Sequence, residues 1–200
     1  MSFLEFILKV QQISKIGLMY SKDPYAVDNY EQLEELSRDM LNKHCEDFTI
    51  TKNIFERDLY PTPSSSVRVL VFNEKNELLM VKEKEDGGWA IPGGWCEIYM
   101  DLKENAIKEC KEEANVDIEL GRLVAIFRRE KYKDYHSVCS EYVHYFVAKA
   151  ISSELKCNHE TEDVRYFSLD ALPKLSLKNS EKELMKALEI YLNHLEVYCD

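Results

Sequence analysis

Apolar residues recur at helical spacing over two stretches at the start of the chain, roughly residues 2 to 19 and 24 to 45. The apolar positions are Phe3, Phe6, Ile7, Val10, Ile13, Ile16 and Leu18, followed by Tyr30, Leu33, Leu36, Met40 and Leu41. The segment Ser21-Lys22-Asp23-Pro24 between them combines capping side chains with a proline, which is favoured at the first position of a helix. We therefore predict an N-terminal helical hairpin, which needs further apolar surface to pack on.

The rest of the chain shows the shorter apolar runs that are typical of strands. We predict strands over residues 67–72, 78–82, 123–129, 142–150 and 164–167, with a turn at residues 73–76. A closing helix is expected from about Ser180 to Tyr198. With one more helix between the second and third strands, this order predicts an α/β fold in which a mixed sheet lies between helices.

That intervening helix is predicted to begin just after Met100. Asp101 is suited to the N-cap, Glu104 stands in the capping-box position, and Asn115 can serve as the C-cap. One side of the helix carries a largely i, i+4 apolar stripe, formed by Leu102, Ala106, Ile107, Cys110 and Ala114. This stripe would pack against the sheet and place the opposite side of the helix at the edge of the core.

Three carboxylates, Glu109, Glu112 and Glu113, occupy that other side. Residues at i+3 and i+4 are surface neighbours, about 5 to 6 Å apart at Cβ, so such like charges destabilise a helix by roughly 0.2 to 0.5 kcal/mol per pair. A bound Mg²⁺ would reverse that cost because it prefers hard oxygen ligands. The alternative is an ordinary solvated acidic face, which is common on exposed helices.

The residues before this helix favour the metal-site interpretation. Residues 89–95 read Trp-Ala-Ile-Pro-Gly-Gly-Trp, a proline-ended extended segment followed by two glycines at which the backbone can turn sharply and approach a ligand. Together with the acidic helix, this segment resembles the signature of the Nudix hydrolase family, Gly-x5-Glu-x7-Arg-Glu-U-x-Glu-Glu-x-Gly-U, where U is a bulky apolar residue. Gly94 opens the motif and Val116 closes it.

The chain departs from this signature at four positions. Met100 stands for the first glutamate, Lys108 for the arginine, Asn115 for the last glycine, and the small Cys110 fills an apolar position. In the family, the first glutamate and the arginine mostly support the metal-binding helix, so their joint replacement can be interpreted as one linked change. All three metal-binding carboxylates are present, which favours a retained reaction over a fold that has lost its activity.

The resemblance implies a Nudix-type α/β/α sandwich that hydrolyses a nucleoside diphosphate linked to another group and releases a nucleoside monophosphate. Mg²⁺, or Mn²⁺ in its place, would be the cofactor. Glu109 and Glu113 are expected to bind the metal directly, and Glu112 to share coordination or orient water. The Gly93 carbonyl would add a ligand, as that position does in the family. Glu160 is a candidate general base on a loop.

Substrate binding calls for arginines that clamp a diphosphate and aromatic rings that stack on a base. Arg68, Arg128 and Arg129 are candidates for the diphosphate, and Trp95, directly after the glycine turn, can line the pocket. Each has an ordinary alternative, a solvated arginine or a tryptophan of the core or rim. The sequence leaves ADP-ribose, CDP-choline and other nucleoside diphosphate derivatives open as substrates.

The N-terminal stretch from Gln11 to Tyr25, with Tyr30 and Leu33, is similar to that of a bacterial Nudix subgroup described as ADP-ribose or CDP-choline pyrophosphatases. There it forms a helical appendage that pairs subunits and leans over the substrate, so the resemblance implies a homodimer. The alternative is a hairpin that only covers apolar sheet surface. We expect an N-terminal helical region at residues 1–58 and a Nudix domain at residues 59–200, whose residues 160–173 also resemble many Nudix C-terminal stretches.

Charge and composition narrow the function classes further. The 200 residues carry 26 Lys and Arg against 37 Asp and Glu, and a net charge of −11 disfavours binding to long nucleic acids. The six cysteines lack zinc-ligand spacing, and no run of about 18 apolar residues marks a membrane span. We therefore expect a cytoplasmic enzyme that needs no membrane. The competing hypothesis is a Nudix-like binding module, a nucleotide sensor that retains the pocket but turns over slowly.

Overall fold

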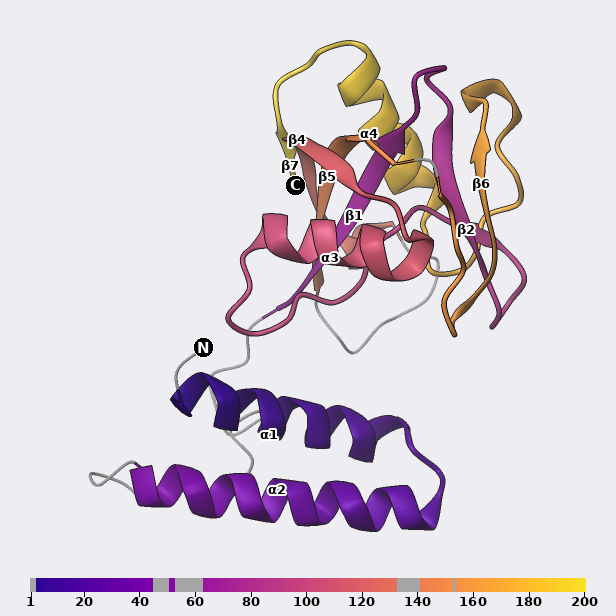
Figure 1. Ribbon diagram of the computed structural model, residues 1–200. Helices are drawn as coiled ribbons and strands as arrows, with labels where there is room; N and C mark the ends of the chain where they lie inside the picture. Colours follow the sequence, from indigo (N-terminus) through magenta and orange to yellow (C-terminus); the bar gives the residue numbers. More distant parts are fainter. Residues whose placement is uncertain (1–2, 45–50, 53–62, 133–140, 153) are drawn as a thin grey trace. The chain divides into compact units, whose positions relative to one another are not determined.

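The computed structural model describes residues 3–44, 51–52, 63–132, 141–152 and 154–200. These residues fall into two compact units, one within Met1–Thr62 and one within Pro63–Asp200 (Figure 1). The predicted boundary between residues 58 and 59 lies outside the described residues. In the described part of the chain, no helix has the length and apolar character needed to cross a membrane.

The first unit is the predicted helical hairpin, formed by α1 (Phe3–Tyr20) and α2 (Pro24–His44). The side chain of Asp23 accepts a hydrogen bond from the Tyr25 backbone N–H (3.1 Å) and so caps the start of α2. The helices approach closely at Gly17, where an added Cβ would overlap the ring of Tyr30. Many apolar side chains of the hairpin are nevertheless exposed, among them Phe3, Phe6, Ile13, Ile16, Leu33, Leu36 and Met40.

The described residues of the second unit form a mixed seven-stranded sheet. Its strands are β1 (Ser64–Phe72), β2 (Leu78–Glu83), β3 (Trp89–Ala90), β4 (Ile118–Arg128), β5 (Glu141–Ala150), β6 (Thr161–Phe167) and β7 (Tyr198–Cys199). The main order is β3-β2-β1-β5-β4-β7, and β6 pairs with β2. The sheet is mixed because β1 runs parallel to β5 along its whole length, whereas β4 and β5 are antiparallel.

Helices cover both faces of this sheet. α3 (Leu102–Ala114) lies on one face and α4 (Glu181–Leu192) on the other (Figure 1). Because side chains alternate along a strand, Val67, Val69 and Val71 of β1 enter the core that contains α3 residues. Leu70 and Phe72 pack in the opposite core with residues of α4. The predicted α/β/α sandwich with a mixed sheet is confirmed.

β1 and β6 each begin three residues before the predicted strand, at Ser64 and Thr161, and two other boundaries differ more. β4 begins at Ile118, earlier than the predicted Leu123. The closing helix ends at Leu192 rather than at Tyr198, because Asn193 caps it and His194 adopts a left-handed backbone (φ 52°). The residues that follow form β7 beside β4. Neither β7 nor β3 is among the predicted strands, since two residues are too few to show an alternating pattern.

Candidate active site

The helix that carries the three carboxylates begins and ends where its capping residues predict. Asp101 Oδ1 accepts hydrogen bonds from the backbone N–H groups of Lys103 and Glu104 (2.8 and 2.9 Å). The Glu104 carboxylate in turn accepts the Asp101 N–H (2.8 Å), and Asn115 closes the helix in a left-handed conformation (φ 55°). The predicted apolar stripe is wrong at Ile107, which is 45% exposed because it lies one position beyond the buried row.

Two side chains of α3 fix the segment that precedes it. Asn105 is fully buried, accepts the Glu97 N–H (2.8 Å) and donates to the backbone carbonyl of Asp101 (2.8 Å). Lys108, at the arginine position of the motif, forms ion pairs with Glu97 (3.2 Å) and with Glu112. Glu97 thus gives Lys108 a carboxylate partner on this segment, although the motif's own glutamate position is a methionine.

The glycine turn is packed closely on both sides, and this packing requires a glycine at position 93. Gly93 has a φ of 147°, and a Cβ there would overlap the Val67 carbonyl oxygen of β1. A Cβ on Gly94 would lie 2.7 Å from Glu109 Oε1. Backbone hydrogen bonds from Val67 N–H to the Gly94 carbonyl and from Val69 N–H to the Pro92 carbonyl (both 2.9 Å) hold the turn against β1. The turn therefore brings bare backbone against the acidic side of α3.

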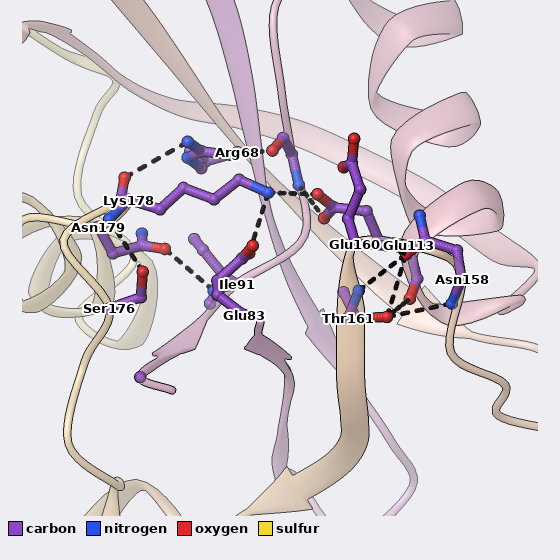
Figure 2. Close-up of polar contacts among 12 residues, drawn as sticks. Arg68, Glu83, Ile91, Glu113, Asn158, Glu160, Thr161, Ser176, Lys178 and Asn179 are labelled. Atoms are coloured by element: carbon purple, nitrogen blue, oxygen red, sulfur yellow. Dashed lines mark hydrogen bonds and ion pairs between the residues drawn. The ribbon is translucent and has the colours of Figure 1, made fainter. Parts of the chain in front are cut away.

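Glu113 and Glu109 both face this turn. Glu113 is buried, accepts the Gly93 N–H at Oε2 (3.0 Å), and is ion-paired at Oε1 with Lys178 (Figure 2). Burial raises the pKa of the Glu109 carboxyl to about 7, and the negative charge of Glu113 adds to the effect against the opposing charge of Lys108. In this carboxylate centre, the ionised form of Glu109 is thus disfavoured unless a cation is near.

Arg68 and Arg129 meet at one backbone carbonyl, although they are distant in sequence. Arg68 on β1 donates to the Gly93 carbonyl and, at 3.4 Å, to the Lys178 carbonyl. Arg129, the first residue of the short 3-10 helix Arg129–Lys131, also donates to the Lys178 carbonyl and pairs with Glu141 (2.9 Å). The third predicted arginine, Arg128, is exposed and lies outside this group.

A cavity of about 590 Å³ opens beside this centre. It is lined by Ser66, Arg68, Glu83, Glu85, Asp86, Gly94, Trp95, Arg129, Glu141, Ser176, Leu177 and Lys178. Trp95 is half exposed at this cavity, in the place predicted for a residue that lines the pocket. Three cationic side chains and an aromatic ring therefore border one cavity, next to the turn that Glu109 and Glu113 face.

Lys178 contacts this centre and was not among the residues that the sequence predicted. It belongs to a segment that is bonded to β3 and to the turn before it. The Trp89 N–H donates to the Lys174 carbonyl and the Ser176 N–H donates to the Trp89 carbonyl (both 2.9 Å), and the Ile91 N–H donates to the Asn179 side chain (3.1 Å). The Asp86 carboxylate accepts the Leu177 N–H (2.7 Å). These bonds place Lys178 across the cavity, whereas the recognised C-terminal resemblance ends at Pro173, so no local pattern marked it.

Asp86 and Glu83 also line the cavity and were not predicted from the sequence. Their pKa values are shifted in opposite directions. Burial acts to raise the pKa of Asp86, but hydrogen bonds from the Leu177 and Gly88 N–H groups outweigh it and lower the pKa. Burial raises the pKa of Glu83, and the adjacent Lys178 ammonium only partly opposes this effect. Glu83 lies 3.0 Å from that ammonium. The ionised form of Asp86 is therefore favoured, whereas the ionised form of Glu83 depends on the charge of Lys178.

The remaining predicted residues, Glu160 and Glu112, are exposed. Glu160 stands in the turn before β6, where its backbone N–H donates to the Asn158 side chain (2.8 Å) and its side chain pairs with His159 (3.5 Å). The next residue, Thr161, donates to the Glu113 backbone carbonyl (3.4 Å). Glu160 is thus anchored near the carboxylate centre through its neighbour, and its carboxylate faces solvent.

The donors around the turn are carboxylate and carbonyl oxygens, the ligand chemistry that Mg²⁺ and Mn²⁺ prefer. The raised pKa of the Glu109 carboxyl also fits a divalent cation, whose charge would favour the ionised form. Among the described residues, however, no three acidic, histidine or cysteine side chains converge to form a ready cluster. The Gly93 carbonyl is bound by Arg68 and Glu112 by Lys108. A cation at this centre would therefore replace existing partners.

Comparisons with known proteins agree with this geometry. Residues 62–188 match the NUDIX domain, and residues 1–49 match the family described as "UDP-X-like, N-terminal oligomerisation domain". A Bacillus subtilis protein named "Putative ADP-ribose pyrophosphatase YjhB" is 34% identical over 194 residues, which cover 96% of this chain and 93% of that protein. An ADP-ribose pyrophosphatase of Methanocaldococcus jannaschii is 26% identical over 62% of this chain and 72% of its own length.

Solved structures add the same fold and related names. The crystal structure of a UDP-X diphosphatase matches with a TM-score of 0.66 and 27% identity, over 99% of this chain and 98% of that chain. An ADP-ribose pyrophosphatase from Streptococcus suis matches with a TM-score of 0.60 and 35% identity, over 70% of this chain and 100% of that chain. The motif, the sandwich fold and these matches together show that the chain belongs to the Nudix hydrolase family, among relatives named as pyrophosphatases.

Proposed function

We propose that the protein is a Mg²⁺-dependent or Mn²⁺-dependent pyrophosphatase that cleaves a nucleoside diphosphate linked to another group and releases a nucleoside monophosphate. The observation that carries this proposal is the carboxylate centre. Glu113 and Glu109 are packed against the glycine turn, and the adjacent cavity presents Arg68, Arg129 and Lys178. The cavity is lined by two arginines and a lysine together with four acidic side chains, Glu83, Glu85, Asp86 and Glu141. A carboxylate centre beside these three cationic groups suits a diphosphate held together with a metal ion.

The carboxylates divide into inner and outer groups. Glu109 and Glu113 would hold the metal, with the Gly93 carbonyl as a further oxygen donor once Arg68 releases it. Glu112, which is exposed, would reach the metal only after leaving Lys108, so we assign it to sharing coordination or orienting water. The metal would supply charge neutralisation of the diphosphate and a water of lowered pKa.

A base is needed to take the proton from the attacking water. Glu160 keeps this role in the proposal, because its backbone is fixed next to Thr161, which bonds the Glu113 carbonyl. Its exposed carboxylate is accessible to bulk water. Replacing Glu160 with Gln should lower kcat while leaving metal affinity unchanged, and a normal kcat would remove Glu160 from the proposal.

The substrate would enter the cavity of about 590 Å³. Arg68 and Arg129 are placed to contact the diphosphate, and Trp95 to contact a base or sugar at the rim. Arg128 is exposed and outside the cavity lining, so we give it no part in this step. ADP-ribose is the first candidate because related proteins carry that name, and UDP-linked and CDP-choline substrates are the next to test.

The helical hairpin is proposed to form a homodimer. Residues 1–49 match an N-terminal oligomerisation domain, and α1 and α2 expose apolar side chains that include Phe6, Ile16 and Leu36. A second copy would bury such a surface. We also place the protein in the cytoplasm. The four cysteines in the described residues, Cys96, Cys110, Cys157 and Cys199, are all free thiols, which suits a reducing compartment.

The deciding experiment is product analysis with the purified protein. ADP-ribose, CDP-choline, UDP-glucose, NADH and nucleoside triphosphates are incubated separately with Mg²⁺, and the products are separated by chromatography. Release of a nucleoside monophosphate from a diphosphate substrate, abolished by a chelator, supports the proposal. Binding without turnover across the panel would instead support a nucleotide sensor, which the absence of a ready three-acid cluster in the described residues also allows.

A further inference from the structure

Lys178 occupies the centre of the proposed metal site with its own positive charge. Its ammonium group pairs with Glu113 Oε1 and lies 3.0 Å from Glu83 Oε1 (Figure 2). Glu113 belongs to α3 and Glu83 ends β2, so the lysine joins two elements of the sandwich. The side chains of Glu113 and Glu83 are only 3% and 11% exposed, which leaves Lys178 as their direct counter-charge.

The two oxygens of Glu113 are not equally available to a metal ion. Oε2 accepts the Gly93 N–H (3.0 Å), and this backbone cannot shift freely because the turn packs tightly against the Val67 carbonyl. Among the described residues, the partner of Oε1 is the end of the flexible Lys178 side chain. Oε1 is therefore the oxygen of Glu113 that a cation can reach with the smaller rearrangement. Two positive groups on one carboxylate oxygen repel each other, so the ammonium has to leave.

The backbone of Lys178 stays in place when its side chain moves. Its carbonyl oxygen accepts hydrogen bonds from both Arg68 and Arg129, and Asp86 holds the preceding Leu177 N–H (2.7 Å). The lysine stem is a flexible four-carbon chain. Because Lys178 itself lines the cavity with Arg68 and Arg129, rotation of this stem would carry the ammonium toward the side chains proposed to contact the diphosphate.

We propose that Lys178 is an exchangeable counter-ion, which a divalent cation displaces from Glu113 and which then binds the diphosphate in the cavity. The inference rests on the proposed function, because it places the cation at Glu113. Cation binding and anion binding would be coupled through one side chain: the cation frees the ammonium, and the diphosphate gives it a new partner. Lys178 would thus neutralise Glu113 and Glu83 while the site is empty, and metal binding would be most favourable when a substrate binds with the metal.

Mn²⁺ binding without any nucleotide tests the exchange directly. Free Mn²⁺ is titrated into the full-length protein and followed by its electron paramagnetic resonance signal, for wild type, Lys178→Met, Lys178→Arg and Glu113→Gln. Lys178→Met should bind Mn²⁺ about five- to tenfold more tightly, because the competing charge is gone. Lys178→Arg keeps the charge and should stay close to wild type. Glu113→Gln should weaken binding about tenfold or more.

The variants separate the two proposals. If Glu113→Gln binds Mn²⁺ as well as wild type does, the metal site at Glu113 is wrong and the proposed function loses its basis. If Glu113→Gln weakens binding but a folded Lys178→Met does not tighten it, only the counter-ion role is overturned. Circular dichroism and thermal unfolding of each variant establish that it is folded.

A second measurement uses the wild-type protein, since Lys178→Met leaves two buried carboxylates unpaired and can destabilise the fold. Lysines are pulse-labelled with acetic anhydride, and acetylation at Lys178 is quantified by mass spectrometry relative to Lys111. Lys111 pairs with Asp117 (2.8 Å) on the exposed side of α3. Mg²⁺ should raise the Lys178 to Lys111 ratio severalfold, while KCl of equal ionic strength should not. An unchanged ratio at saturating Mg²⁺ would overturn the exchange.

Discussion

Glu112 and Glu113 are adjacent in the sequence, yet α3 turns them into different environments. The Glu113 side chain is 3% exposed, and that of Glu112 is 53% exposed. Glu113 is held by the Gly93 N–H and by an ammonium group from a distant segment, whereas Glu112 pairs with Lys108 one turn earlier on the same helix. One step of about 100° around the helix separates a carboxylate built into the fold from one carried on a solvated face.

The largest expected effect follows from exchanging these two carboxylates for amides. Glu113→Gln should reduce kcat by about 100-fold or more, because a neutral amide cannot hold a divalent cation at the buried centre. Glu112→Gln should reduce it by about tenfold or less, since the exposed carboxylate has solvent and Lys108 as partners. Steady-state kinetics on the substrate identified in the panel, at saturating Mg²⁺, gives both values.

Equal losses in the two variants would mean that burial does not distinguish the carboxylates in the reaction. The thermal unfolding of both proteins should be recorded first, because Glu113→Gln also removes the counter-charge of Lys178. A Glu113→Gln protein that turns over at the wild-type rate would remove this residue from the catalytic centre altogether.

The glycine turn offers a comparison of backbone positions. Gly93→Ala should destabilise the protein by about 3 kcal/mol or more, because φ is 147° and the new Cβ would overlap the Val67 carbonyl. Gly87 also has a positive φ, 66°, but a Cβ there meets no atom within 4 Å. Gly87→Ala should therefore cost only about 1 kcal/mol. Urea unfolding monitored by fluorescence measures both, and similar values would show that the turn can relax.

The parts of the site that could be predicted from the sequence are those that lie within one short segment of the chain. The caps of α3, its carboxylates and the glycine turn all lie within one short segment, so their spacing predicts their geometry. Lys178 lies 65 residues from Glu113 and reaches it only because β3 pairs with the segment around Ser176. The spacing of neighbouring residues also could not choose between Arg128 and Arg129. That choice depends on β4 passing into a 3-10 helix at this point, which turns Arg129 inward.

Another buried carboxylate, Glu183 of α4, tests whether burial alone shifts proton binding. Burial raises the pKa of Glu183, while the charge of Arg129 and a hydrogen bond from the Tyr145 hydroxyl (3.2 Å) oppose the shift. Because its pKa is raised in the folded state, the contribution of Glu183 to the free energy of unfolding is greatest below the ordinary carboxyl pKa of 4.5. This contribution is lost as the pH rises through the folded-state pKa. Gln does not titrate. The stability of Glu183→Gln relative to wild type should therefore rise with pH.

Urea unfolding of both proteins at a series of pH values between about 4 and 8 measures this difference. The comparison cancels the many carboxylates that the two proteins share. A stability difference that stays constant over this range would mean that Glu183 has no shifted pKa, and that Arg129 fully balances its burial.

The smallest expected effect lies on the exposed side of α3. Lys108→Met removes ion pairs to Glu97 (3.2 Å) and Glu112, all of them partly exposed, and should cost about 0.5 to 1 kcal/mol. Lys111→Met is the matched control, since it breaks a single exposed pair with Asp117 and should cost about 0.5 kcal/mol or less. Urea unfolding compares them.

Lys108 stands where the family motif has an arginine, so a larger loss would change the description of this side of α3. A cost above about 2 kcal/mol, or a loss of Mn²⁺ affinity, would show that Lys108 and Glu97 hold the segment before α3 as firmly as Lys178 holds Glu113. A cost near that of Lys111→Met would instead show that Asn105, buried and bonded to the Glu97 N–H and the Asp101 carbonyl, fixes this segment without the ion pairs. The structure favours the second outcome because the Asn105 contacts are shielded from water and those of Lys108 are not.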